Sequence, residues 1–157
     1  KSTGVKNVTL TGGEPLIQNE IKELMIELSN IGNRIEIETN GSINIAPYLN
    51  IPNVTFTLDY KLKGSGMEMY MDLTNYDLLR KNDVIKFVVS DYDDLEKTKE
   101  IIKKYDLINK ANCLISPVWG RIEFEEIVNF LKDNKLNDVK MQLQIHKIIW
   151  DKDKRGV

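Results

Sequence analysis

The stretch Thr11-Gly12-Gly13-Glu14-Pro15 decides how the rest of this sequence is interpreted. It follows a short apolar strand and precedes a helix that is predicted to begin near Gln18. The two glycines allow the backbone to turn sharply and to approach a ligand closely, because neither carries a Cβ atom. Pro15 then fixes the direction in which the chain leaves the turn. We therefore expect Glu14 to project at the C-terminal end of a strand, where α/β proteins bind their ligands.

Two interpretations of this turn stay open at this point. A carboxylate at the end of a strand suits an ammonium group of a ligand. The same five residues also fit an ordinary strand-to-helix turn, in which an acid lies near the positive end of the helix.

Strands and helices alternate along the rest of the chain. Strands are expected at 5–10, 34–39, 54–59, 84–89, 112–118 and 139–145. Helices are expected at 18–31, 73–80, 91–105 and 122–133, where apolar residues recur at helical spacing. The segment 61–71 contains two glycines and is expected to be a long loop. This order predicts an α/β fold with a parallel sheet and helices outside it.

Length and composition fit one domain over residues 1–157 with a core of its own. Apolar residues make up 41% and charged residues 29% of the 157 residues, as in a globular protein. The formal net charge of -2 argues against electrostatic binding to nucleic acid. No apolar run is long enough to span a membrane, and no signal-peptide pattern opens the sequence. We expect a cytoplasmic location and, because the chain starts at Lys1, a piece of something longer.

The strands alternate between apolar and polar residues. A parallel strand that is covered on both faces is apolar throughout, so alternation indicates one covered face and one polar face. We expect the polar side chains to point into a shared cavity, although a half-covered sheet that faces solvent is the alternative. The polar residues are Thr9, Thr11, Glu36, Glu38, Thr55, Thr57, Asp59, Lys86, Gln142, Gln144 and His146.

Polar and glycine-containing groups follow the C-terminal ends of the predicted strands. In α/β barrels the loops at these ends form the active site. The groups are found at 11–15, 38–41, 59–61, 90–91, 116–120 and 146–147. The sequence therefore predicts one functional site, formed by the loops at the C-terminal ends of the strands; this end of the sheet is called the rim below.

Beyond these patterns, the chain resembles a known enzyme family. Six segments are similar, in order, to the 7-carboxy-7-deazaguanine synthase branch of the radical S-adenosylmethionine (radical SAM) superfamily. They are 8–16, 38–41, the loop with Lys61 and Ser65-Gly66, 85–90, 114–118 and 142–150. The Gly-Gly-Glu-Pro motif carries the resemblance to the superfamily, and Gln-Leu-Gln-Ile-His-Lys at 142–147 carries the resemblance to the branch. The resemblance implies a partial (β/α)6 barrel of parallel strands that lacks its first strand-helix unit, so that residues 1–157 form its C-terminal portion.

The resemblance also implies a reaction. This family converts 6-carboxy-5,6,7,8-tetrahydropterin to 7-carboxy-7-deazaguanine with loss of ammonia, on the path to queuosine. Its cofactors are S-adenosylmethionine, a 4Fe-4S cluster and Mg2+, and these carry the difficult chemistry while the protein positions it. A reductase or flavodoxin supplies electrons to the full-length enzyme, and family members are commonly homodimers.

Roles for single residues follow from the resemblance. Gly12, Gly13 and Glu14 would hold the amino group of S-adenosylmethionine. Its ribose or carboxylate would contact Asp59 and Lys61. Further contacts to the cofactor would come from Asn40 and Ser90 on the same rim. Substrate contacts would come from Thr11 and His146. We expect Glu38 and Lys86 to form an ion pair across the interior of the barrel, and the alternative is that both contact the substrate.

The chain departs from the family at the iron-sulfur site. The family binds its cluster through three cysteines that precede the first strand of this sequence, and none of that motif is present. Cys113 is the one cysteine and cannot supply three thiolates. We therefore expect this chain to be inactive by itself. The alternatives are another radical SAM enzyme, such as a glycyl-radical activating enzyme, or a nucleotide-binding module, although a G-x-G-x-x-G fingerprint is missing.

Overall fold

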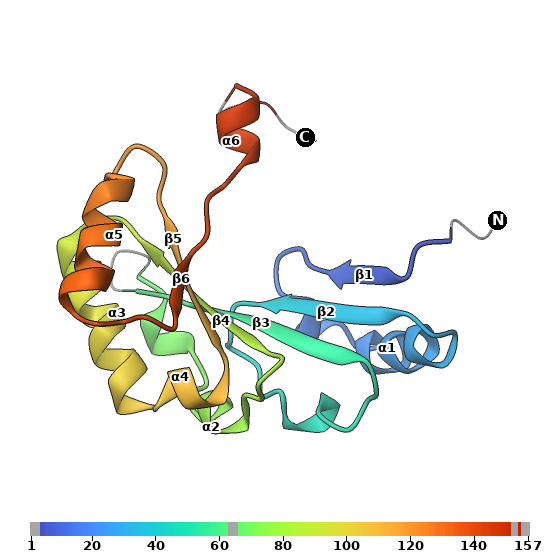
Figure 1. Ribbon diagram of the computed structural model, residues 1–157. Helices are drawn as coiled ribbons and strands as arrows, with labels where there is room; N and C mark the ends of the chain where they lie inside the picture. The colour runs from blue at the N-terminus through green and yellow to red at the C-terminus, as the bar shows by residue number, and fades with distance from the viewer. Residues whose placement is uncertain (1–3, 63–65, 152–153, 155–157) are drawn as a thin grey trace.

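The computed structural model describes residues 4–62, 66–151 and 154, and within them six strands form a single parallel sheet. The strands lie side by side in the order in which they occur in the sequence, so each is paired with the next (Figure 1). They are β1 (Asn7–Leu10), β2 (Arg34–Thr39), β3 (Val54–Tyr60), β4 (Val84–Val89), β5 (Asn112–Pro117) and β6 (Val139–Met141). This confirms the predicted α/β fold with parallel strands.

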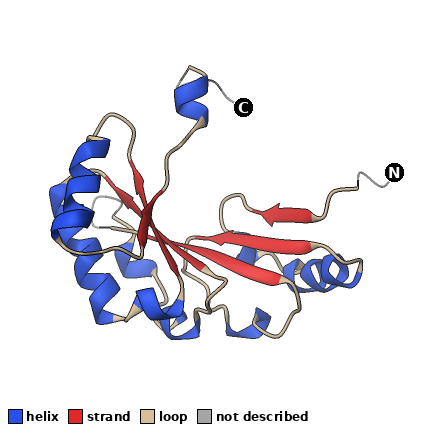
Figure 2. Ribbon diagram, in the orientation of Figure 1, coloured by secondary structure: helices blue, strands red, loops and turns tan. Residues whose placement is uncertain are grey.

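Helices line one side of the curved sheet, while α6 stands apart from the others (Figure 2). The α-helices are α1 (Ile21–Asn30), α2 (Asn75–Leu78), α3 (Tyr92–Lys104), α4 (Leu107–Lys110), α5 (Phe124–Asp133) and α6 (His146–Ile149). Short 3-10 helices are η1 (Pro15–Ile17), η2 (Ala46–Tyr48) and η4 (Glu68–Tyr70). Within the described ranges, β1 and β6 form the two edges of the sheet, so the barrel is open.

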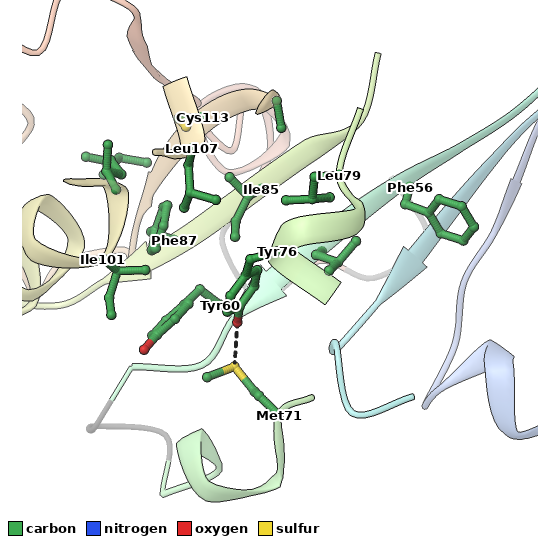
Figure 3. Close-up of a cluster of buried hydrophobic side chains, with 14 of the residues drawn as sticks. Phe56, Tyr60, Met71, Tyr76, Leu79, Ile85, Phe87, Ile101, Leu107 and Cys113 are labelled. Carbon is green, nitrogen blue, oxygen red and sulfur yellow. Dashed lines mark hydrogen bonds between the residues drawn. The ribbon is translucent and has the colours of Figure 1, made fainter. Parts of the chain in front are cut away.

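An aromatic and aliphatic core fills the space between the sheet and its helices. The ring centroids of Tyr60 and Phe87 lie 5.3 Å apart, and those of Tyr60 and Tyr76 lie 5.9 Å apart (Figure 3). The hydroxyl of Tyr76 donates to the sulfur of Met71, and the backbone N–H of Lys61 donates to the same sulfur at 3.2 Å. The core therefore fixes the chain at the point where β3 ends and its loop begins.

Two buried polar side chains fasten the ends of the strands. Asp83 is completely buried and accepts hydrogen bonds from the backbone N–H of Phe56 and from the backbone and guanidinium of Arg80. Asn75 is equally buried and bonds to the backbone of Gly41 and Ile43, and it accepts from Ile45. A buried polar group without such partners would be costly. Asp83 thus holds together the N-terminal ends of β3 and β4, and Asn75 fixes the loop after β2.

Some predicted boundaries are corrected by the structure. The first helix begins at Ile21 after a 3-10 turn, and the predicted helix at 73–80 is shortened to α2. The last strand ends at Met141, so His146 begins a helix rather than ending a strand. The short helix α4 was not predicted. This helix has only four residues, about one turn, and helical periodicity cannot be detected over so short a segment.

Candidate functional site

The predicted glycine turn lies at the C-terminal end of β1 with its backbone exposed. Gly12 has a φ of 120°, a conformation that other residues rarely adopt. No other atom lies within 4 Å of the position that a Cβ atom would occupy on Gly12 or Gly13. The turn therefore leaves open space beside its backbone, as the prediction of a close approach by a ligand requires.

Glu14 does not project from this turn, and the expectation that it would is wrong. Its side chain is buried, and its carboxylate accepts hydrogen bonds from the backbone N–H groups of Leu16 (3.0 Å) and Asn40 (2.7 Å). The hydroxyl of Thr39 lies 2.9 Å from both of its oxygens. Thr39 shares the helix-covered face of β2 with Ile37, because side chains two apart point to the same side. Glu14 thus connects the glycine turn to the end of β2.

The polar face on β1 and β2 is built from carboxylates and hydroxyls. Glu36 accepts from the hydroxyl of Thr57 at 2.8 Å and from that of Thr9 at 3.4 Å. Nearer the rim, Glu38 accepts from the hydroxyl of Thr11 at 3.0 Å. Thr9 and Thr57 lie on the strands that flank β2, and Thr11 directly follows the end of β1, so these groups form one surface.

On β3 and β4 the polar face is cationic. Asp59 is paired through one oxygen with Lys61 at 3.2 Å and through the other with Lys86 at 3.1 Å. The expected ion pair between Glu38 and Lys86 is therefore wrong, because Lys86 lies level with Asp59 on the adjacent strand and pairs there. Asp59 and Lys61, both predicted to contact the cofactor, pair with each other, and their contact with the cofactor stays a prediction.

The polar face is an open surface, and the described residues do not show the shared cavity that we expected. Thr9, Thr11 and Glu38 are exposed, which agrees with the alternative of a half-covered sheet. The face also becomes partly apolar toward β5, where Val88 and Leu114 occupy positions that alternate with buried residues. The alternation predicted the face correctly, but it could not predict whether the face would be closed.

A second part of the rim lies at the ends of β3, β4 and β5. A hollow there is lined by Lys61, Val88, Ser90, Asp91, Val118 and Arg121, among others. The hydroxyl of Ser90 donates to Asp94 at 2.7 Å, and Asp91 caps α3 by accepting from the N–H of Asp94. Ser90 therefore lies in the predicted place, with its hydroxyl proton engaged by Asp94.

Two further residues, Asn40 and His146, were predicted to contact the cofactor and the substrate. Asn40 donates its backbone N–H to Glu14, and its side chain accepts from the N–H of Ser42 at 2.9 Å. His146 is the first residue of α6, and its side chain lies outside the described part of the structure. The proposed contacts of these residues with a ligand stay predictions.

The described residues do not contain a metal site. In residues 4–62, 66–151 and 154, no group of three or more histidine, cysteine or acidic side chains is placed to hold a metal ion. Cys113 is buried on the helix-covered face of β5, and burial raises the pKa of its thiol to about 11. A neutral, enclosed thiol is a poor ligand for iron.

Comparison with known proteins places this arrangement in a family. No family model matches the chain. A 7-carboxy-7-deazaguanine synthase of Clostridium acetobutylicum is 58% identical over the full length of the chain, which spans 72% of that protein. The chain belongs to the 7-carboxy-7-deazaguanine synthase family. The resemblance stated from the sequence is thereby confirmed.

Solved structures agree on the fold of this synthase-family chain. QueE from Escherichia coli has a TM-score of 0.61 at 22% identity, covering 88% of this chain and 56% of QueE. Streptococcus suis SuiB, in a crystal structure bound to S-adenosylmethionine, has a TM-score of 0.64 at 15% identity, covering 88% of this chain and 39% of SuiB. At these identities the likeness concerns the fold alone. Within the described ranges, no helix has the length and apolarity needed to cross a membrane.

Sequence reasoning missed several residues of the synthase-family site. Thr39 was not singled out, although a hydroxyl at an apolar position of a strand signals a buried partner. Arg121 was missed because it lies in a loop without a motif. Lys86 was singled out but assigned to the wrong partner, since strand register cannot be derived from alternation alone.

Proposed function

We propose that this chain is the C-terminal portion of a radical SAM enzyme that converts 6-carboxy-5,6,7,8-tetrahydropterin to 7-carboxy-7-deazaguanine with loss of ammonia. The observation that carries this proposal is the 58% identity to a synthase of that name over the whole chain. The open edge at β1 and the exposed Ile17 and Leu24 beside the glycine turn support a preceding strand-helix unit.

The residues present fit S-adenosylmethionine. Carbonyl groups of Gly12 and Gly13, which border open space, would accept from its ammonium, while Glu14 would act by fixing their conformation. Lys61 would attract its carboxylate, and Ser90 lines the same hollow. In the full-length enzyme, S-adenosylmethionine together with the iron-sulfur cluster would supply the radical chemistry that the reaction needs.

The pterin would bind over the polar face. Thr11 and Glu38 lie at its rim, and the exposed carboxylate of Glu38 is suited to the N–H groups of an aminopyrimidinone ring. His146 follows β6 at the same end of the sheet, so a contact with the substrate stays part of the proposal.

The residues present do not fit a 4Fe-4S cluster. Cys113 is buried and single, and its neutral thiol cannot replace three exposed thiolates. We therefore propose that this chain alone is inactive and that the cluster ligands belong to a preceding segment. Mg2+ would take its ligands from the substrate or from that segment. Iron and sulfide analysis after anaerobic reconstitution of the 157-residue chain is expected to find no stable cluster, and one full cluster per chain would contradict this.

The partners named from the resemblance belong to the same proposal. They are a reductase or flavodoxin as electron donor, a second copy of the chain in a homodimer, and a cytoplasmic location. Turnover of the carboxylated tetrahydropterin by the full-length protein tests the function. It also separates this proposal from a glycyl-radical activating enzyme, which would not use that substrate. Binding of S-adenosylmethionine but not of dinucleotides, measured by calorimetry, separates it from a nucleotide-binding module.

A further inference from the structure

The charges on the polar face are divided between its two halves. Among the described residues, the carboxylates of Glu36 and Glu38 on β2 accept hydrogen bonds from threonines. In the part of the chain that the structure describes, neither forms a salt bridge. This half of the face is therefore negative and is rich in hydrogen-bond acceptors.

The other half carries an excess positive charge. Lys61 and Lys86 share the single carboxylate of Asp59, so the three side chains have a net charge of +1. Their side chains are only 23–30% exposed. An uncompensated charge at that degree of burial is poorly solvated and is stabilised by an anion. The cluster is therefore built to receive one negatively charged group.

Lys86 differs from Lys61 in its position. Lys61 follows the end of β3 and lines the rim hollow, whereas Lys86 lies inside β4 and is level with Asp59 and Leu114. Val88 is the next residue on the same face of β4, so Lys86 borders an apolar surface. A flat ring could pack on that surface while its charged substituent reached the ammonium.

The two halves are spaced for one heterocycle. Glu38 on β2 is level with Thr57 and Val84, and Lys86 lies two residues further along β4. Two strand spacings and two residues along the strand separate their backbones by roughly 12 Å. A pterin with a carboxylate at one end and an aminopyrimidinone at the other has the matching division of charge. Its N–H groups suit the acceptors near Glu38, and its carboxylate suits the cationic half.

We propose that Lys86 is a specificity-determining residue, which binds the carboxylate of the pterin substrate and thereby selects carboxylated over uncarboxylated pterins. This inference rests on the proposed function. Asp59 is then a positioning residue, which pairs with Lys86 through one oxygen and with Lys61 through the other. Lys61 then binds the carboxylate of S-adenosylmethionine.

The test is binding of two ligands to the full-length enzyme, with 6-carboxy-5,6,7,8-tetrahydropterin and 5,6,7,8-tetrahydropterin as anaerobic calorimetry probes. The wild type is expected to prefer the carboxylated form by roughly tenfold to hundredfold, as for a charged hydrogen bond. In Lys86→Met this preference is expected to fall below about threefold, with affinity for the uncarboxylated form and for S-adenosylmethionine unchanged. Lys140→Met is the matched control, because Lys140 lies in the same row of the sheet and is exposed.

Several other results would overturn the inference. Lys86→Met could keep the preference, which would place the carboxylate elsewhere. It could weaken both pterins equally, which would indicate a structural role. It could weaken S-adenosylmethionine instead, which would assign Lys86 to the cofactor. Lys140→Met could reduce the preference as strongly, which would indicate a general field effect. A wild-type enzyme that binds neither pterin would contradict the proposed function as well.

Discussion

The carboxylate of Glu14 and the hydroxyl of Thr39 join two strand ends, with 2.9 Å between the hydroxyl and each carboxylate oxygen. This contact lies on the helix-covered face of the sheet, opposite the polar face. The acid of the Gly-Gly-Glu-Pro motif is therefore part of the scaffold, and the glycines before it present the exposed backbone.

Glu14→Gln is expected to lower the free energy of unfolding by about 2–3 kcal/mol, because a buried acceptor of charged hydrogen bonds becomes partly a donor. Urea unfolding of the 157-residue chain measures this. Glu27→Gln is the matched control, because Glu27 is exposed on α1. Equal stability of both variants would contradict the scaffold role of Glu14.

Substitutions of Gly12 and Gly13 are expected to distinguish a glycine that the backbone conformation requires from a glycine that leaves room for the ligand. Gly12→Ala should lower stability by about 1–3 kcal/mol, because its φ of 120° is strained for alanine. Gly13→Ala has open space around it and should change stability by less than about 0.5 kcal/mol. In the full-length enzyme, Gly13→Ala should nevertheless weaken S-adenosylmethionine binding by roughly tenfold, since the methyl group would meet the ligand. Unchanged affinity would place the cofactor away from this turn.

Asp83→Asn is expected to be among the most destabilising single substitutions in the chain. The completely buried carboxylate accepts from Phe56 and Arg80, and its loss leaves the guanidinium of Arg80 without its charged partner. We expect a loss of about 3–5 kcal/mol in a urea titration. Asp138→Asn, at an exposed position, serves as the comparison and should change stability little. A loss below about 1 kcal/mol for Asp83→Asn would contradict the bridging role.

Stability is expected to fall at alkaline pH. Burial raises the pKa of Cys113 from 9.0 to about 11, and burial likewise raises the pKa of Tyr60 and Tyr76. A raised pKa in the folded state favours the neutral form there, so the unfolded state loses its protons first and stability decreases as pH rises. For Cys113 the loss develops between pH 9 and about 11.

Cys113→Ala isolates the contribution of the thiol. The variant should lose less stability between pH 9 and pH 11 than the wild type, by up to about 2–3 kcal/mol. Unfolding curves at these two pH values measure the difference. Identical pH dependence in the two proteins would show that the thiol does not contribute.

The sequence was sufficient for the positions of the strands along the chain and for the face on which the polar residues of β1 to β4 lie. It was not sufficient for Gln142, Gln144 and His146, which follow the end of β6 at Met141 and do not lie on a strand. Glu36 and Glu38 were placed correctly because alternation has a period of two residues. The partner of Lys86 was not predictable, because it depends on register and on the direction of a long, flexible side chain. Burial of Glu14 was missed for a related reason. The motif suggests an exposed acid, and only the three-dimensional approach of Thr39 shows that the carboxylate turns inward.

The most direct test of the account is product analysis with the full-length protein. The anaerobically reconstituted enzyme is supplied with a reductant, S-adenosylmethionine, Mg2+ and 6-carboxy-5,6,7,8-tetrahydropterin, beside the 157-residue chain treated in the same way. Mass spectrometry is expected to detect 7-carboxy-7-deazaguanine from the full-length enzyme and none from the chain alone. A reconstituted full-length enzyme that leaves the pterin unchanged, or a chain that turns it over by itself, would contradict the account.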